Sequence, residues 1–231
     1  MFYLTLLSCF VPLTKNMGIN DRKEREKEEL RQRILQAAVE VFLDKGYENT
    51  SIRAIAEKIE YSPTTLYLYY KDKNALLHAV HQWGFHRMFD MFQPVGAIEN
   101  PFNRIQEQGR LYLKFAFENP GLYDLMFIQK LTLPEEDHDD ADWHEGSSAF
   151  DSLVHNVKEC MRVGLFKEAH PEVLAFTIWA MMHGIATLQI KCRSEKVLSE
   201  EIRPNITQLA FEQFTHVLRS YKVGSTIAQT M

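Results

Sequence analysis

Hydrophobic residues recur at helical spacing in the first part of the chain, and short polar breaks divide them into separate helices. Residues 22–44 begin highly charged and continue as one apolar stripe, after which Gly46 suits the left-handed position that ends a helix. A shorter apolar face follows over residues 51–59, with Thr50 as its expected N-cap. The pattern therefore predicts a long helix followed closely by a short one.

A second pair of helices is predicted directly downstream. Ser62 is an expected N-cap, and Pro63 suits the first helical position, where a missing N–H costs nothing. This third helix is expected to end near Tyr69, and Asp72 is expected to cap a fourth helix over residues 73–92. Two short helices joined by a tight turn, after a longer helix, describe a helix-turn-helix, although any small three-helix bundle gives the same pattern.

The rest of the chain also has helical periodicity, with no strand candidate and no internal repeat. Residues 134–146 are acidic and lack periodicity, so a loop is expected there. Helices are predicted over residues 100–119, 120–128, 150–163, 171–192 and 199–221, with a frayed tail after them. The predicted fold is therefore all-α, with an N-terminal three-helix head containing the helix-turn-helix (residues 17–80) and a larger C-terminal helical body (residues 81–231).

Charge is divided unevenly between these two parts. The 231 residues carry a formal net charge of −5, which argues against a protein that coats nucleic acid nonspecifically. Residues 17–80 contain 11 basic and 11 acidic residues, whereas the residues from 81 onward contain 14 basic and 20 acidic ones. The acidity therefore belongs to the body, and the head is neutral.

Two apolar stretches need a reading other than a membrane span. Residues 1–16 are too short to cross a bilayer and lack a signal-peptide cleavage pattern, so we expect a non-native or disordered extension before Met17. A real apolar N-terminal arm is the alternative. Residues 173–190 include polar side chains and are expected to be buried in a core or an interface.

Three widely spaced cysteines suit free thiols in a reducing cytoplasm, so a cytoplasmic protein with no membrane partner is expected.

A dense motif runs from Arg33 to Val80. It contains an A-x-x-x-F pattern before Lys45-Gly46-Tyr47, followed by Thr50, Ile55-Ala56, Ser62, Thr65-Leu66-Tyr67, Tyr69-Tyr70, Lys73 and Ala75-Leu76-Leu77. This stretch, about a fifth of the chain, resembles the N-terminal DNA-binding domain of TetR-family transcriptional regulators. Glu60 stands where the family usually has glycine, and Leu68 where it often has histidine. The resemblance therefore specifies the fold but not the operator sequence.

The resemblance implies that the third helix reads DNA bases while neighbouring residues hold backbone phosphates. Thr50, Tyr67 and Lys73 would contact phosphates. Because the head is neutral, we expect modest affinity that depends on dimerisation and falls strongly with salt. The complete predicted DNA face is Thr50, Arg53, Ser62, Pro63, Thr64, Thr65, Tyr67, Leu68, Tyr69, Lys71 and Lys73.

The chemistry of the side chains agrees with this assignment. Thr64 and Thr65 can hydrogen-bond bases or phosphates. Pro63 and Leu68 can touch thymine methyl groups, and Arg53 can reach a guanine or a phosphate. Packing is the alternative role for each tyrosine in this stretch.

A weaker resemblance covers residues 109–127 and 179–188. They look like the branch of the TetR family whose C-terminal domain has a Trp-His-Gly signature, which here is Trp179 followed by His183-Gly184. Membership implies an all-α domain that binds a ligand and dimerises. Large apolar side chains at helical spacing are more often core than ligand contacts, and His183 can equally be a buried, hydrogen-bonded core histidine. The candidate effector contacts are Phe115, Tyr123, Met126, Phe127, Trp179, Met182 and His183.

A homodimer is expected to form through the last two long helices. Its predicted contacts are Ile202, Ile206, Leu209, Phe214, Val217 and Leu218. Such a dimer would bind a pseudo-palindromic operator as a repressor and leave it when a small, largely apolar effector binds. The alternative is a helical small-molecule-binding protein or enzyme that keeps the helix-turn-helix as scaffold.

Catalytic and metal-binding patterns find no support. His78 and His81 share a helix face, but no acidic or sulfur ligand accompanies them nearby. Residues 138–144 suit a solvated acidic loop better than a cation site. The sequence has no Ser–His–Asp order, Gly-rich phosphate loop or HExxH motif. We therefore expect no metal, no cofactor and no enzymatic activity.

Overall fold

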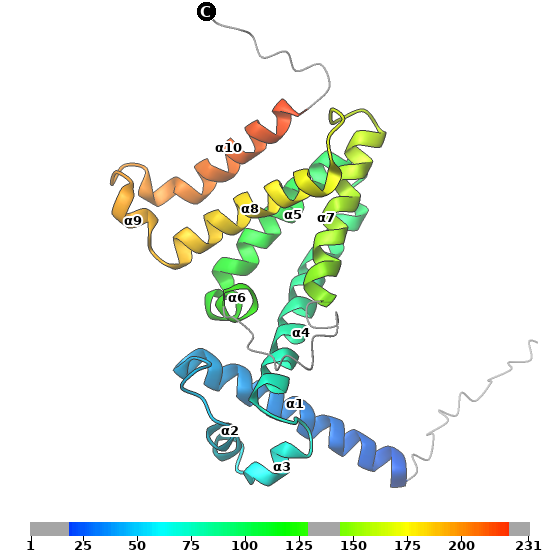
Figure 1. The fold of residues 1–231 in the computed structure, drawn as a ribbon, viewed down its shortest axis with the longest axis vertical. Coiled ribbons are helices and arrows are strands. Elements are labelled where there is room, and N and C mark those ends of the chain that lie inside the picture. The colour runs from blue at the N-terminus through cyan, green and yellow to red at the C-terminus, as the bar shows by residue number, and fades with distance from the viewer. Residues whose placement is uncertain (1–18, 129–143, 222–231) are drawn as a thin grey trace, which may run out of the picture.

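A small helical head and a larger helical body are joined by one long helix (Figure 1). The computed structural model describes residues 19–128 and 144–221, and every element there is a helix. The predicted extension over residues 1–16 and most of the predicted acidic loop lie outside these residues. The elements are α1 (Ile19–Lys45), α2 (Ile52–Lys58), α3 (Pro63–Tyr67), α4 (Lys73–Phe92), η1 (Gln93–Ala97), α5 (Pro101–Glu118), α6 (Pro120–Phe127), α7 (His144–Arg162), α8 (Pro171–Ile190), α9 (Ser194–Val197), η4 (Arg203–Asn205) and α10 (Ile206–Ser220).

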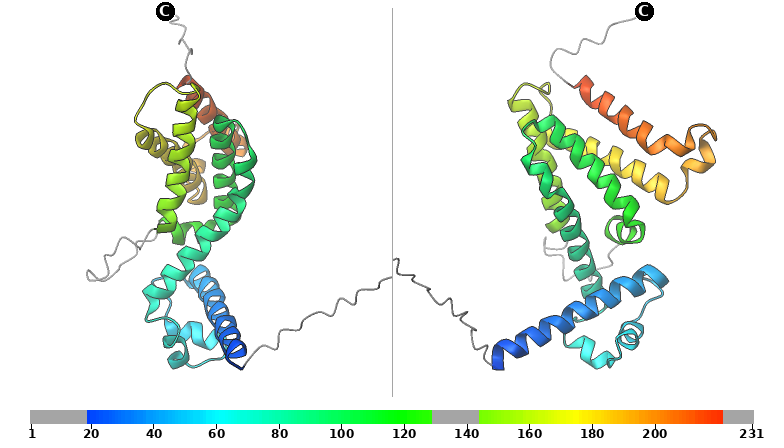
Figure 2. Two further views of the ribbon diagram at one scale, coloured as in Figure 1. Left: turned by 90° about the vertical axis from the view of Figure 1, so that its right-hand side faces the viewer. Right: turned by 180° about the vertical axis from the view of Figure 1, so that it is seen from behind.

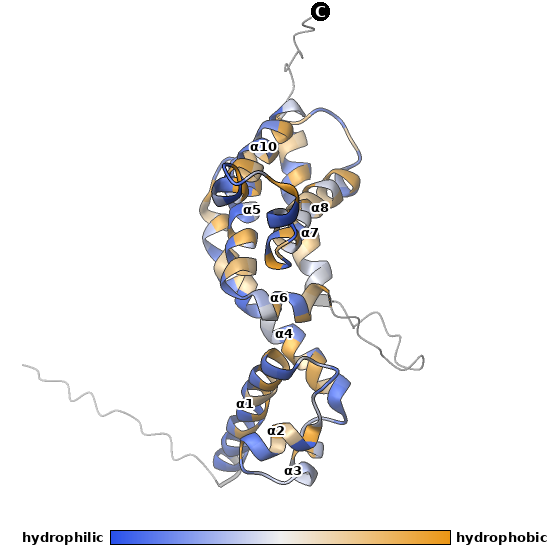
Figure 3. Cartoon of the chain, turned by 90° about the vertical axis from the view of Figure 1, so that its left-hand side faces the viewer, coloured by the Kyte–Doolittle hydropathy of each residue, from blue (hydrophilic) through white to orange (hydrophobic). Residues whose placement is uncertain are grey.

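One face of α1 holds the head together. Ile34, Ala38 and Phe42 are buried there, whereas the first half of the helix is hydrophilic and exposed (Figure 3). Gly46 has a φ of 76°, the left-handed conformation expected after a helix end. The Tyr47 ring then packs edge-on against Phe42, with 5.5 Å between ring centroids. This confirms the predicted end of the first helix.

The start of α2 differs from the prediction. Ser51, and not Thr50, is the N-cap, because the Ser51 hydroxyl accepts from the backbone N–H of Ala54 at 3.2 Å. The Thr50 side chain is buried, and its hydroxyl donates to the carbonyl oxygen of Gly46 at 2.8 Å. Serine and threonine are both good N-caps. The turn before α2 points the Thr50 hydroxyl into the head, so Ser51 takes the capping position.

The caps of α3 and α4 agree with the prediction. Ser62 and Asp72 each accept a hydrogen bond from the backbone N–H three residues further on, at 3.2 Å and 2.8 Å. α3 is shorter than predicted, ending at Tyr67 rather than near Tyr69. In the turn before α3, Glu60 has a φ of 61°, a left-handed conformation that glycine adopts more readily than a residue with a Cβ atom.

Three helices, α5, α7 and α8, pack against one another at the centre of the body, and α10 packs along α8 (Figure 2). α4 contacts α1 in the head and α5, α6 and α7 in the body. α6 also reaches the head, where Gly121 lies against the Leu43 side chain of α1. The position of the body relative to the head is therefore set by α4 and α6.

Two boundaries in the body differ from the predicted ones. α7 begins at His144, inside the predicted loop over residues 134–146. The last helix begins at Ile206 rather than residue 199, after a separate 3₁₀ turn that contains Pro204. The ring of a proline clashes with the preceding helical turn, so Pro204 stands before the helix and not within it.

Candidate functional site

One side of α3 is anchored in the head and the other is presented to solvent. Leu66 is buried and fixes the helix against the core, while Tyr67 and Leu68 are 55% and 78% exposed. Thr64 is exposed and Pro63 is half-buried at the first helical position. The structure therefore brings four of the predicted DNA-contacting residues together on one surface.

Hydroxyl groups at the start of α3 are largely used within the head. Ser62 Oγ and Thr65 Oγ1 lie 2.9 Å apart and hydrogen-bond each other, in addition to the N-cap bond. Tyr69 is half-buried and packs against the core, and Tyr70 is buried. Thr64 and Tyr67 are therefore the hydroxyl-bearing residues of α3 that remain exposed.

The structure changes the roles of two predicted phosphate contacts. Thr50 is 4% exposed and its hydroxyl bonds inside the head, so its side chain does not reach the surface. Lys73 Nζ donates to the carbonyl oxygen of Tyr47 at 3.0 Å and lies 4.1 Å from the centre of the Tyr47 ring. Arg53 stays on the exposed face of α2, ion-paired with Glu57 at 2.9 Å. Lys73 thus fastens the head together, while Arg53 and the exposed Lys71 keep their cations on the surface.

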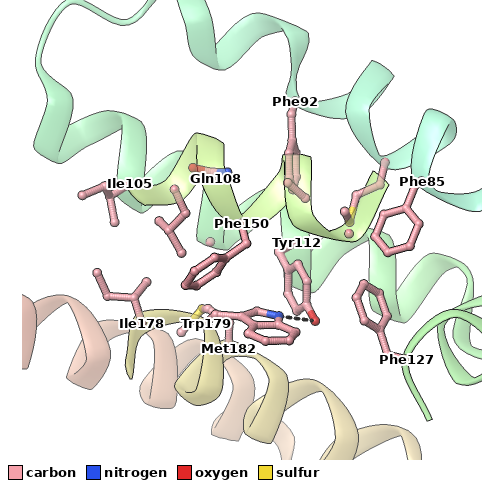
Figure 4. Close-up of a pocket in the computed structure, with 15 residues that line it drawn as sticks. Phe85, Phe92, Ile105, Gln108, Tyr112, Phe127, Phe150, Ile178, Trp179 and Met182 are labelled. Carbon is pink, nitrogen blue, oxygen red and sulfur yellow. Dashed lines mark hydrogen bonds between the residues drawn. The ribbon is translucent and has the colours of Figure 1, made fainter. Parts of the chain in front are cut away.

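A cavity of about 60 Å³ lies in the body between α4, α5, α6, α7 and α8 (Figure 4). Its described lining contains no charged side chain, and Gln108 and Tyr112 are its polar residues together with the Trp179 indole N–H. Gln108 Oε1 accepts from Asn156 Nδ2 at 3.2 Å, so one polar end is already partnered. The lining residues are Phe85, Met88, Phe92, Ile105, Gln108, Gly109, Tyr112, Phe127, Gly146, Ala149, Phe150, Leu153, Ile178, Trp179 and Met182.

A chain of hydrogen bonds forms the other polar end of the cavity. Trp179 Nε1 can only donate, and it donates to Tyr112 Oη at 3.4 Å. Tyr112 Oη lies 2.9 Å from Tyr123 Oη, and Tyr123 Oη lies 2.7 Å from His183 Nδ1. With His183 neutral and its Nδ1 accepting, the chain runs from the indole through both phenols to the imidazole.

Burial reinforces this arrangement of protons. It lowers the pKa of His183 and so favours the neutral ring that the chain requires. Burial also raises the pKa of Tyr112 and of Tyr123, which keeps both phenols protonated. The polar end can consequently offer hydrogen bonds to a ligand but no countercharge.

The predicted effector contacts fall into three groups. Phe127, Trp179 and Met182 line the cavity. Tyr123 and His183 lie behind Tyr112 and support it, rather than lining the cavity themselves. Phe115 and Met126 are wrong as cavity contacts: both are buried core residues, with Met126 packed against Gly84.

Sequence reasoning missed the contribution of α4 to the cavity. Phe85, Met88 and Phe92 recur at helical spacing, which was a detectable signal of a buried face. Gln108 was also missed, because an isolated glutamine within an apolar stripe has no distinctive pattern.

The predicted dimer contacts are only partly available on the surface. Phe214 and Leu218 are buried within the protomer, so they are not contacts for a second copy. The apolar stripe on α10 serves both the core of the protomer and the outer face of the helix, and spacing alone does not separate these two roles. Ile202, Leu209 and Val217 are exposed, and Ile206 is half-buried.

Histidine, cysteine and carboxylate side chains do not gather into a group of three that could hold a metal ion anywhere in the described residues. His138 and the acidic residues beside it lie outside those residues.

Two sequence models of known domains match this chain. The model described as bacterial regulatory proteins of the tetR family matches residues 34–80. The model described as the tetracyclin repressor-like C-terminal domain matches residues 105–201, which include Trp179, His183 and Gly184. Together the two matches cover most of the head and most of the body.

Individual relatives agree with the two domain matches. The HTH-type transcriptional regulator UidR of Escherichia coli strain K12 is 38% identical over 60 residues, which are 26% of this chain and 31% of UidR. A Rhodococcus sp. RHA1 protein of unknown function has a TM-score of 0.66 at 23% identity, over 81% of this chain and 94% of its own. AibR, in complex with isovaleryl coenzyme A and operator DNA, has a TM-score of 0.59 at 20% identity, over 82% of this chain and 96% of its own. These structures share the fold over 81% and 82% of this chain, whereas the sequence match to UidR spans 31% of that relative.

Proposed function

Since this chain belongs to the TetR family of bacterial regulatory proteins, we propose that it is a homodimeric transcriptional repressor that leaves its operator when a small apolar effector binds. It would act in the cytoplasm, where the DNA is, and it would carry out no chemical reaction. AibR, whose structure contains both an acyl coenzyme A and operator DNA, supports a ligand-responsive role for this fold.

The path of α4 is the observation that carries this proposal. Lys73 at its start bonds the carbonyl oxygen of Tyr47 in the head, whereas Phe85, Met88 and Phe92 further along line the cavity. A ligand that separates the walls of the cavity therefore acts on the helix that also packs against α1 of the head. The binding energy of the ligand would drive this displacement and shift the dimer towards a spacing of its two α3 helices that does not fit the operator.

The chemistry of the cavity supports an uncharged effector. A carboxylate or phosphate placed among its aromatic side chains would lose its hydration without gaining a countercharge. A cavity of about 60 Å³ is small, so a larger effector must displace ring side chains such as Phe92 and Phe150. Any charged group on the effector would have to remain outside.

An exposed apolar face of α8 supports the dimer. Val173, Phe176, Ala180, Gly184 and Leu188 form a stripe on α8 with three- and four-residue spacing, and all are exposed or half-buried. A side chain added at Gly184 would meet no atom within 4 Å, so this part of the stripe is open to a close-packed partner. By length and composition α8 could also cross a membrane, and 28% of its apolar window is buried in the protomer. A second copy covering this stripe accounts for both observations.

Footprinting on the DNA that flanks the gene, with and without neutral lipophilic compounds, tests the proposal. The expected result is a protected pseudo-palindrome whose protection is lost when an effector is added. A Thr64→Ala, Tyr67→Ala variant should lose at least about tenfold in affinity, because both side chains are exposed on α3. An Arg22→Ala variant, which changes a residue on the exposed first half of α1, is the control for a loss of DNA affinity that does not depend on α3. If the parent protects no DNA even at low salt, the helix-turn-helix is only a scaffold and the alternative of a small-molecule-binding protein or enzyme stands.

A further inference from the structure

We infer that this protein reads its operator mainly through thymine methyl groups, with Leu68 as the principal specificity-determining side chain. The inference rests on the proposed function. Residues 62–70 contain no charged and no amide side chain. Guanine is read by Arg or Lys, adenine by Asn or Gln, and cytosine by Asp or Glu, so α3 lacks all of these readers. Thymine is the base whose distinguishing group, the 5-methyl, is recognised by apolar contact.

Leu68 has the position that such a contact requires. It is the C-cap residue of α3 and is 78% exposed, while Leu66 on the other side of the helix is buried. Exposed Tyr67 and half-buried Pro63 lie on the same short helix, so the apolar surface continues beyond one side chain. Burying this surface against methyl groups in the major groove removes apolar area from water on both partners.

The polar groups near α3 do not provide an alternative readout of the bases. The hydroxyls of Ser62 and Thr65 bond each other, and Lys73 bonds the carbonyl oxygen of Tyr47. Arg53 lies on α2, outside α3, and its exposed guanidinium pairs with Glu57. Thr64 and Tyr67 remain, and a hydroxyl group bonds to more than one kind of base, so neither discriminates well between bases.

Replacement of thymidine by deoxyuridine tests the inference, because it removes the methyl group and leaves the base pairing unchanged. The probe is a duplex recovered by the full-length protein from a pool of random-sequence duplexes, remade with deoxyuridine in each half-site. We expect the parent to lose affinity about fourfold for each contacted methyl, the factor that burial of one methylene-sized group gives. Leu68→Ala should bind the thymidine duplex more weakly and should lose little further affinity on the deoxyuridine duplex. Leu43→Ala, a change at an exposed leucine elsewhere on the head, should keep the full discrimination of the parent.

The outcomes separate this inference from the proposed function. Equal affinity of the parent for the two duplexes would overturn thymine readout while leaving operator binding intact. An equal loss for the parent and Leu68→Ala on deoxyuridine would show that another side chain contacts the methyls, and would overturn the assignment to Leu68. Failure of the parent to enrich any duplex would instead contradict the proposed function. Denaturant unfolding of each variant verifies that a weaker complex does not reflect an unfolded head.

Discussion

At the scale of single residues, the turn before α3 contains a strained position. Glu60 has a φ of 61°, and a non-glycine residue held in this conformation costs about 1–3 kcal/mol. Glu60→Gly should relieve that strain but also increase the entropy of the unfolded chain. We expect a net gain of roughly 0.5–1 kcal/mol in the free energy of unfolding, measured by urea titration.

A matched control for this substitution lies three residues earlier. Glu57 is exposed within α2, where glycine is unfavourable by about 1 kcal/mol. Glu57→Gly should therefore destabilise the head. If both variants were destabilised equally, the left-handed backbone at Glu60 would not be under strain.

The histidine at the end of the hydrogen-bond chain gives a prediction about pH. Burial lowers the pKa of His183 below its ordinary value of 6.5, so the unfolded chain binds this proton more readily than the folded one. The stabilisation that comes from neutral His183 should therefore be fully present above pH 6.5. The free energy of unfolding should then fall as the pH drops towards the lowered folded-state pKa. His183→Gln keeps an acceptor for Tyr123 without a titration in this range, so its stability should depend less on pH.

This comparison uses denaturant unfolding of both proteins at several pH values. The difference between their slopes isolates the contribution of His183. Identical slopes would mean that the ring is not held neutral by its surroundings.

At the scale of elements, the contact between α6 and α1 is a second link between body and head. A Cβ atom added to Gly121 would lie 2.7 Å from Leu43 Cδ2. Close by, Lys191 at the end of α8 forms an ion pair with Asp124 of α6. Gly121→Ala should therefore displace the exposed Leu43 side chain and loosen this contact, which we expect to cost about 1 kcal/mol or less in the free energy of unfolding, measured by thermal or urea unfolding.

Gly96 provides the control, because a Cβ atom added there meets nothing within 4 Å. Gly96→Ala should leave the free energy of unfolding within about 0.5 kcal/mol of the parent. A Gly121→Ala variant as stable as Gly96→Ala would show that Leu43 rotates away freely and that this contact does not fix the two parts.

At the scale of the whole molecule, the proposed dimer would form through the apolar stripe of α8. Phe176 is 57% exposed in the protomer and lies within that stripe. Phe176→Asp should raise the dissociation constant of the dimer by about a hundredfold, because a symmetric dimer contains the residue twice. Analytical ultracentrifugation measures this change directly.

The control is Leu68→Asp, which places the same charge on an exposed residue of the head. It should leave the dimer intact while impairing DNA binding. If Phe176→Asp remained dimeric at the lowest measurable concentrations, the protomers would associate through another surface.

Local patterns determined most of the helices and their ends. Ser62 and Asp72 as caps, and Gly46 as a left-handed stop, depend on the backbone within one turn, so their chemistry is visible in the sequence. Pro204 is an equally local signal for the late start of α10, because a proline ring does not fit inside a helix that begins at residue 199.

The sequence by itself determined an all-helical chain with a helix-turn-helix head, because periodicity and capping are local properties. Only the tertiary structure decided which equivalent residues serve which purpose. Thr50 and Lys73 turned inward although their chemistry suits phosphate, and Phe214 packs inside while Val217 on the same helix stays exposed. The cavity likewise depends on five helices meeting, since the empty space between them results from packing and has no residue of its own.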